Sequence, residues 1–234
     1  MPRPAATRDL ERRSFLQLAA LAAGGAWLPS GRTRIEAGEL DYAAFLARAV
    51  PIARELVAER SRIGEDRYLL ALATEAVRLR DVPVPEMRDT TQVGATARKW
   101  LGANEGGDPF VVLHWRLDPG AVIEQHAHTY GSVVTLCLEG EVRVRNFEMV
   151  GARDFEAKGP FPVRCVVDQV LRPGSINVVA LEHTYTHGFV AGPQGARGLD
   201  LTTRIRDKQP SPQLTVSAAP IDAARAIYEG SWRA

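Results

Sequence analysis

The stretch Gly120-Ala-Val-Ile-Glu-Gln-His126-Ala-His128 decides the fold, and it holds two of the five histidines of the chain. The stretch alternates as a β-strand does, and alternation places side chains two positions apart on one face. Positions 124, 126 and 128 are therefore expected to point the same way. A His-x-His pair on one strand can bind a metal ion through two imidazoles if the fold supplies further ligands. The alternative is two exposed loop histidines beside a turn, and the sequence around the pair favours the metal site.

Short strand-like runs surround this stretch between residues 96 and 206. Turn signals separate them at Pro119-Gly120, Glu139-Gly140, Gly159-Pro160 and Pro173-Gly174. Many short strands at this spacing predict an all-β fold, an antiparallel sandwich or barrel of jelly-roll type. The predicted strands cover residues 110–117, 132–138, 141–147, 163–167, 176–181 and 197–203.

Composition excludes several functional classes. The 234 residues carry 29 Lys and Arg against 28 Asp and Glu, a formal net charge of +1. This balance gives no electrostatic basis for binding nucleic acid or an anionic membrane. The two cysteines, Cys137 and Cys165, are too few for a disulfide framework. The two cysteines are either joined by one disulfide bridge or, as we expect, unbridged and buried as small apolar side chains.

The first residues are typical of an export signal rather than of a folded domain. Arg3, Arg8, Arg12 and Arg13 precede a short apolar run over residues 15–23, and this run is too short for a stable membrane span. The stretch Glu11-Arg12-Arg13-Ser14-Phe15-Leu16-Gln17 resembles the twin-arginine signal. No cysteine follows for a lipid anchor. We therefore expect a periplasmic or secreted protein with no stable membrane anchor.

A helical pattern follows from about residue 40 to residue 80, where Tyr68, Leu72 and Ala76 recur at intervals of four. Pro51 and Ile63-Gly64 divide the pattern into two or three short helices, which we expect outside the later sheet. Pro220 stands at a suitable first position for a short closing C-terminal helix. The predicted segments are an export signal over 1–30, helices and linker over 31–95, a barrel over 96–210 and a C-terminal tail with a helix over 211–234.

These residues resemble the cupin superfamily, whose folds are double-stranded β-helix barrels. Its first motif runs Gly-x5-His-x-His-x3,4-Glu-x6-Gly, and Gly120, His126, His128 and Gly140 fall in register. The expected Glu position holds Val133. The resemblance therefore implies a site built from three histidines, without a carboxylate ligand.

The third histidine is expected in the stretch His183-Thr-Tyr-Thr-His187, where strand parity puts both histidines on one face. The residues that follow, His187-Gly-Phe-Val-Ala and Ala196-Arg-Gly-Leu-Asp200, look like the cysteamine and plant cysteine dioxygenases. This resemblance implies His126, His128 and His187 as the metal ligands, with Asp200 supporting the site. His183 is the rival to His187.

Other side chains are candidates with weaker grounds. Tyr130 and Tyr185 are expected to hydrogen-bond oxygen or substrate, or else to line the barrel with satisfied hydroxyls. Glu124 shares a face with the histidine pair. It is therefore a candidate fourth ligand or proton acceptor, and the alternative is that its side chain turns to solvent at the start of the strand. Arg98 is either an anchor for a substrate carboxylate or a surface arginine. His114, beside Trp115, is expected to be structural.

Three neutral imidazoles leave open positions on a metal ion for water, oxygen or substrate. Nitrogen ligands suit zinc, nickel, manganese and copper as well as iron, and the resemblance favours Fe(II). It implies an Fe(II) dioxygenase that adds O2 to a small molecule such as a thiol, giving a sulfinate. The alternatives are a cupin that binds a metal or ligand without turnover, and a dioxygenase of aromatic or diketone substrates. The expected partners are a small-molecule substrate and O2. Cupin barrels often pair through their sheets, so the resemblance also allows a homodimer, although the sequence itself does not show the oligomeric state.

Overall fold

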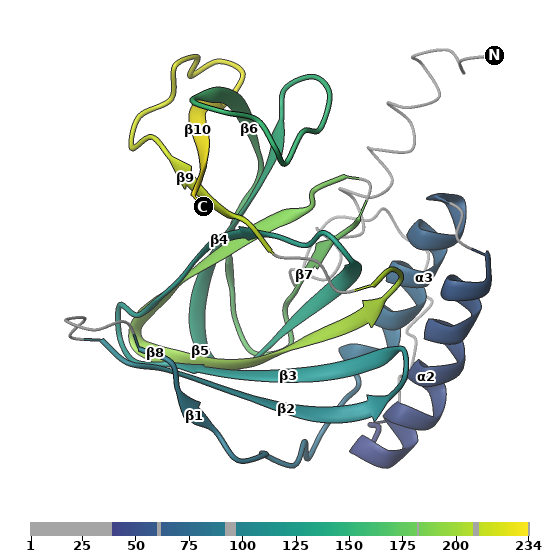
Figure 1. Ribbon diagram of the computed structural model, residues 1–234. Coiled ribbons are helices and arrows are strands. Elements are labelled where there is room, and N and C mark those ends of the chain that lie inside the picture. Colours follow the sequence, from purple (N-terminus) through teal and green to yellow (C-terminus); the bar gives the residue numbers. More distant parts are fainter. Residues whose placement is uncertain (1–38, 60–61, 92–96, 182, 208–210, 234) are drawn as a thin grey trace, which may run out of the picture.

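The computed structural model describes residues 39–59, 62–91, 97–181, 183–207 and 211–233 (Figure 1). The predicted export signal over residues 1–30 lies outside the described residues. The predicted segment boundaries therefore stay predictions.

Within the residues that the structure describes, two helices precede the sheet, as the sequence predicts. They are α2, Tyr42–Glu59, and α3, Arg62–Ala76. The Asp41 carboxylate caps α2 by accepting a hydrogen bond of 2.7 Å from the Ala44 amide. Pro51 lies inside α2, so the helix continues through the position where the sequence suggested a division. Neither described helix has the length and apolar character that crossing a bilayer requires.

Ten strands in the described part of the chain pair antiparallel throughout, which confirms the predicted all-β barrel. In chain order they are β1, Arg88–Asp89; β2, Lys99–Gly107; β3, Phe110–Leu117; β4, Val122–Ala127; β5, Gly131–Met149; β6, Phe161–Leu171; β7, Ile176–Val179; β8, Thr186–Arg204; β9, Gln213–Val216; and β10, Ile227–Arg233.

The two longest strands, β5 and β8, close the barrel. Each has 19 residues, they pair with one another, and the circuit β8–β4–β9–β10–β6–β5 returns to β8. The sequence predicted two strands separated by a turn at Glu139-Gly140, and this is wrong, because β5 runs through both residues. Gly140 has φ +68° at an irregularity in the ladder, and a Cβ there would lie 2.1 Å from the Gly195 carbonyl oxygen. Only glycine fits both demands, so the strand bends here without ending.

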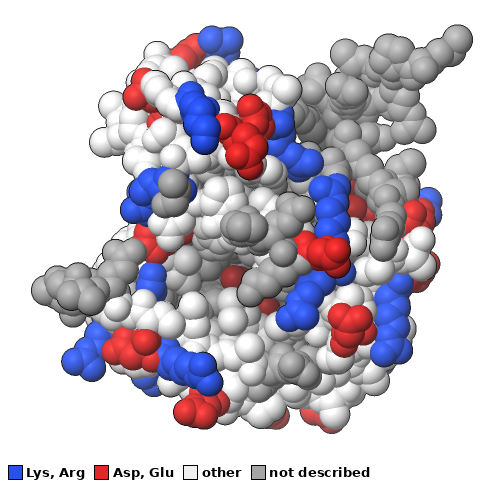
Figure 2. All heavy atoms as spheres, in the orientation of Figure 1, with Lys and Arg blue, Asp and Glu red and all other residues white. Residues whose placement is uncertain are grey.

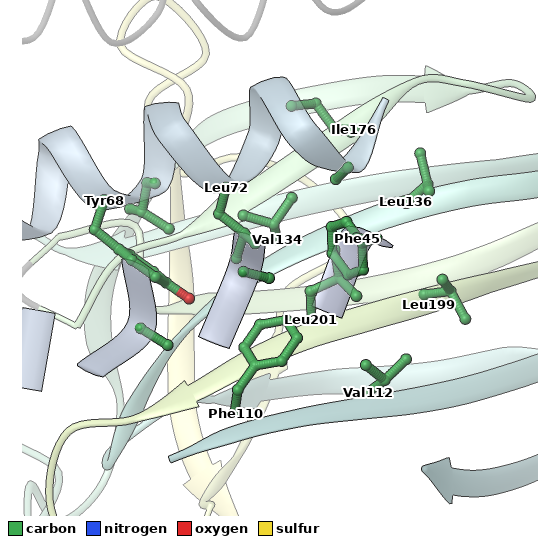
Figure 3. Packing of buried hydrophobic residues seen from close by; sticks show 14 of the residues in the cluster. Phe45, Tyr68, Leu72, Phe110, Val112, Val134, Leu136, Ile176, Leu199 and Leu201 are labelled. Carbon is green, nitrogen blue, oxygen red and sulfur yellow. The ribbon is translucent and has the colours of Figure 1, made fainter. Parts of the chain in front are cut away.

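The helices cover the outer face of one layer of the barrel (Figures 1 and 3). Phe45 and Leu72 pack with Val134, Leu136 and other residues of β3, β5, β7 and β8. The predicted packing of the helices outside the sheet is confirmed.

Helix α3 is also fixed to the barrel by polar side chains. Tyr68 hydrogen-bonds Thr203 near the end of β8. Glu65, 3% exposed, accepts hydrogen bonds from the Ser132 hydroxyl and, at 2.5 Å, from the Leu181 amide. These bonds connect the helix to β5, to β8 and to the segment between β7 and β8.

A second apolar cluster fills the barrel interior. It joins Trp115, Val144 and Phe189 to residues of neighbouring strands, including the free and buried Cys137. Cys165 is also free, so the two cysteines are not bridged.

The predicted C-terminal helix over residues 220–228 is wrong. Asp222 and Arg225 form a turn, Ala226 has φ +51°, and Ile227 begins β10, which pairs with β6 and β9. A left-handed residue ends any helical path, and the apolar side chains that follow pack in the small core of the lobe that β6, β9 and β10 form (Figure 1).

Candidate metal centre

Three histidines meet where β4 pairs with β8. His126 and His187 are register partners across this pair, and a bulge in β4 lies just before His126. His128 follows the end of β4, and its amide donates a hydrogen bond of 2.8 Å to the Tyr185 carbonyl. Nitrogen atoms of the three rings, one from each histidine, lie within 4.8 Å of one another. The structure thus brings together the three predicted ligands.

One pair of ring nitrogens has the spacing expected for two ligands of one ion. His128 Nε2 and His187 Nε2 are 2.9 Å apart. Two nitrogens at about 2.1 Å from an ion and at a right angle to each other are separated by about 3.0 Å. The ring centroids lie 4.7 to 5.0 Å apart. This arrangement suits three ligands on one triangular face of an ion.

Burial keeps the three rings neutral, as ligands must be. It lowers the pKa of His126, and it lowers the pKa values of His128 and His187 well below the usual range, helped by the neighbouring rings. His126 Nδ1 donates a hydrogen bond of 2.9 Å to the Glu124 carbonyl oxygen, and this leaves Nε2 as the nitrogen that can bind a metal ion. Among the described residues, Nδ1 of His128 and of His187 has no hydrogen-bond partner.

His183 does not join this group. Its Nε2 lies 3.6 Å from the Asp66 carboxylate on α3. The parity argument fails because residues 180, 181 and 183–185 are not in a strand, and Thr184 has φ +50°. The left-handed residue turns the chain between His183 and His187, so the two side chains diverge.

Glu124, predicted as a possible fourth ligand, instead forms an ion pair with Lys99. Its Oε2 accepts a hydrogen bond of 2.9 Å from Lys99 Nζ. Burial alone would raise the pKa of Glu124, but the Lys99 hydrogen bond and the charges of Lys99 and Arg233 outweigh it, and the pKa is lowered. Arg98 is exposed, next to the inward Lys99. Sequence reasoning missed Lys99, although the alternation of Lys99, Trp100 and Leu101 in a strand could have shown that Lys99 and Leu101 share a face.

Asp200 lies in the same barrel but bonds elsewhere. Its Oδ1 accepts a hydrogen bond of 2.6 Å from the Thr135 hydroxyl, and no described hydrogen bond joins it to the three histidines. Burial raises the pKa of Asp200 to about 7, although the Thr135 bond lowers it. Its predicted part in the reaction stays a prediction, and the contact seen is with β5.

The predicted tyrosines have structural contacts. The Tyr185 hydroxyl accepts a hydrogen bond of 2.9 Å from the Met149 amide, and its ring packs on Phe155. The Tyr130 carbonyl accepts hydrogen bonds from two amides after β8. These contacts support structural roles, and a role for either hydroxyl in the reaction stays a prediction. His114 is buried outside the metal group, and burial lowers its pKa to about 4.

An aromatic wall connects the histidines to the interior core. The Phe189 ring lies 4.7 Å from the His187 ring and 5.5 Å from the Trp115 ring, between centroids. One side of the site is thus apolar, whereas Lys99 and Glu124 make another side charged. A small molecule at the histidines would meet both.

No family model and no curated protein sequence matches this chain. Among solved structures, it is similar to KdgF from Halomonas sp., with 20% identity and a TM-score of 0.36 over 52% of this chain and 88% of that one. An uncharacterized conserved protein with a double-stranded beta-helix domain from Klebsiella pneumoniae has 16% identity and a TM-score of 0.38, over 52% and 87% of the two chains. Recombinant pro-11S globulin of pumpkin has 13% identity and a TM-score of 0.38, over 54% and 30%. Likeness at this level leaves activity, metal and ligand to be argued from the site itself.

Proposed function

We propose that this protein binds one Fe(II) ion through His126, His128 and His187 and adds O2 to a small molecule such as a thiol. The observation that carries the proposal is the meeting of three neutral imidazoles from β4 and β8, with His128 Nε2 and His187 Nε2 2.9 Å apart. Their resemblance to the three-histidine thiol dioxygenases favours iron. Nitrogen ligands alone also suit zinc, nickel, manganese and copper.

The donor set fits the ion. Each ring is held neutral by burial, and Val133, at the position where other cupins carry a carboxylate ligand, is fully buried and apolar. Fe(II), when bound, supplies the redox chemistry that lets O2 react with a closed-shell molecule. Three protein ligands leave positions on the ion for other molecules.

The residues of the chain have separate tasks around such an ion. The histidines bind it, and the Glu124 carbonyl orients the His126 ring through Nδ1. Phe189 and Trp115 exclude water on one side of the site. In the overall reaction a thiol and O2 give a sulfinic acid: sulfur loses four electrons, O2 gains four, and both oxygen atoms enter the product. No external reductant is needed.

The test is oxygen consumption by protein loaded anaerobically with Fe(II). Given cysteamine, cysteine or 3-mercaptopropionate, the protein should consume one O2 per thiol and form the sulfinate, measured by an oxygen electrode and mass spectrometry. A His128→Ala variant is the control and should lose both activity and iron. Full iron occupancy without oxygen uptake on any thiol, catechol or diketone would overturn the proposal and leave a binding protein.

We also propose that residues 1–30 direct export through the twin-arginine route, which carries folded proteins. Support comes from Arg12, Arg13, Phe15 and Leu16, which match the signal pattern. A fusion of residues 1–35 to a reporter should be exported only in a strain with the twin-arginine translocase. Undiminished export in the deletion strain would refute this.

A further inference from the structure

The register of β2 sets a lysine on the inner face of the barrel. Leu101 pairs with Trp115, and Lys99 pairs with Leu117, in the interior cluster. Trp100, between them, turns to the opposite face, where the Arg116 guanidinium lies 4.1 Å from its ring centroid. Cross-strand partners share a face, so Lys99 faces inward.

The Lys99 ammonium has more donors than the described chain uses. Its Nζ donates to Glu124 Oε2 at 2.9 Å, and its side chain is only 15% exposed. An ammonium group has three N–H donors, and among the described residues Glu124 is its one acceptor. A largely buried ammonium is costly unless acceptors surround it, so the two remaining donors favour an anionic or strongly polar ligand.

This ammonium lies one residue away from the metal ligands. Glu124 holds Lys99 by its carboxylate and His126 Nδ1 by its carbonyl. Lys99 is thus tied to the histidine site through a single residue.

The C-terminal strands add a second positive charge at the same place. His126 pairs with Gln213 of β9, and Gln213 pairs with Arg233 of β10. The charges of both Lys99 and Arg233 act on the Glu124 carboxylate, so two positive charges lie near one negative charge. The face drawn in Figure 2 is hollowed near its centre, and acidic atoms are visible within the hollow.

We propose that Lys99 is an anion subsite, which binds the carboxylate of a short organic acid whose other end reaches His126, His128 and His187. The inference rests on the proposed function and names its substrate class: a molecule with a metal-binding group and a carboxylate. Arg233, which is exposed, adds a second positive charge near Glu124. Arg98, for which the sequence allowed this task or a surface position, is exposed.

The test compares 3-mercaptopropionate with its methyl ester, which differ only in the charge of the carboxylate. Binding to cobalt(II)-loaded protein is titrated without oxygen, from the thiolate absorption band and by calorimetry. Hydrogen bonds to charged groups contribute about 10- to 150-fold in affinity. The wild type should bind the acid at least 10-fold more tightly than the ester.

Lys99→Met should lower the affinity for the acid at least 10-fold and leave the affinity for the ester within 2-fold. Lys99→Arg should keep the preference for the acid. Arg98→Met, at the neighbouring exposed position, is the matched control and should behave as the wild type. Because Lys99→Met leaves Glu124 unpaired beside His126, the Lys99→Met/Glu124→Gln variant repeats the test without that carboxylate.

Equal affinities of the wild type for the acid and the ester would overturn the proposed subsite. An unchanged affinity for the acid in both Lys99→Met and Lys99→Met/Glu124→Gln would overturn it as well. In either case cobalt binding and oxygen uptake on thiols would remain, and the proposed function would stand. Failure of the wild type to bind cobalt would instead contradict the metal site itself.

Discussion

Replacing Glu65 tests whether helix α3 holds the barrel in shape. The Glu65 carboxylate is 3% exposed and accepts hydrogen bonds from the Ser132 hydroxyl and the Leu181 amide, from two segments distant in sequence. In Glu65→Ala both donors are left buried without their partner. Each such loss costs about 1–3 kcal/mol in the free energy of unfolding, so the two together cost about 2–6 kcal/mol.

The Ser132 hydroxyl can rotate toward another acceptor, whereas the Leu181 amide cannot. We therefore expect a loss of about 3 kcal/mol for Glu65→Ala, a large share of the roughly 5–15 kcal/mol that stabilises a typical domain. Glu65→Gln keeps an acceptor oxygen but loses the charge, and it should cost about 1–2 kcal/mol.

The assay is equilibrium unfolding in urea, followed by circular dichroism and tryptophan fluorescence. Glu55→Ala, at an exposed position on α2, is the control and should change the free energy of unfolding by no more than about 0.5 kcal/mol. If Glu65→Ala stays within about 1 kcal/mol of the wild type with an unchanged slope, the reasoning about this buried carboxylate is wrong.

Two further predictions concern the barrel. Burial raises the pKa of Asp200 to about 7, whereas an unfolded aspartate loses its proton at a pH of about 4. The free energy of unfolding should therefore fall as the pH rises from about 4 to about 7, because only the folded state still holds this proton. Asp200→Asn should remove that fall. An unchanged pH profile in the variant would contradict this. Gly140→Ala should cost more than about 3 kcal/mol, because strain at φ +68° adds to a Cβ 2.1 Å from the Gly195 carbonyl oxygen. The control Gly159→Ala, at φ +76° with open space around it, should cost only about 1–2 kcal/mol in the same urea assay, and equal costs would show that the close approach is unimportant.

The barrel follows from local pattern because strands and turns leave local signals. The strand over residues 110–117 coincides with β3, Phe110–Leu117. The histidine pair followed from spacing, and His187 followed from resemblance. Each wrong prediction about the backbone has its cause in the conformation of one residue. Gly140 bends one long strand where a turn was expected, and Thr184 and Ala226 are left-handed residues that propensity does not reveal.

The charged side of the site needed the register between strands. A sequence does not show which strand pairs with β2 or that β9 and β10 return to His126. Lys99 reaches Glu124, 25 positions further along the chain, and Arg233 comes near the site through the pairing of β10 with β9 and of β9 with β4. The predicted helix at the C-terminus concealed this, since only as a strand does the segment carry Arg233 beside Gln213.

The most direct test of the account is the metal content of four variants, measured by mass spectrometry after loading with Fe(II) or cobalt(II) and removal of free ions. The wild type and His183→Ala should each hold one ion per chain, because His183 contacts Asp66. His126→Ala, His128→Ala and His187→Ala should each lose most of it. Full occupancy in the His187 variant, or loss in the His183 variant, would contradict the three-histidine centre.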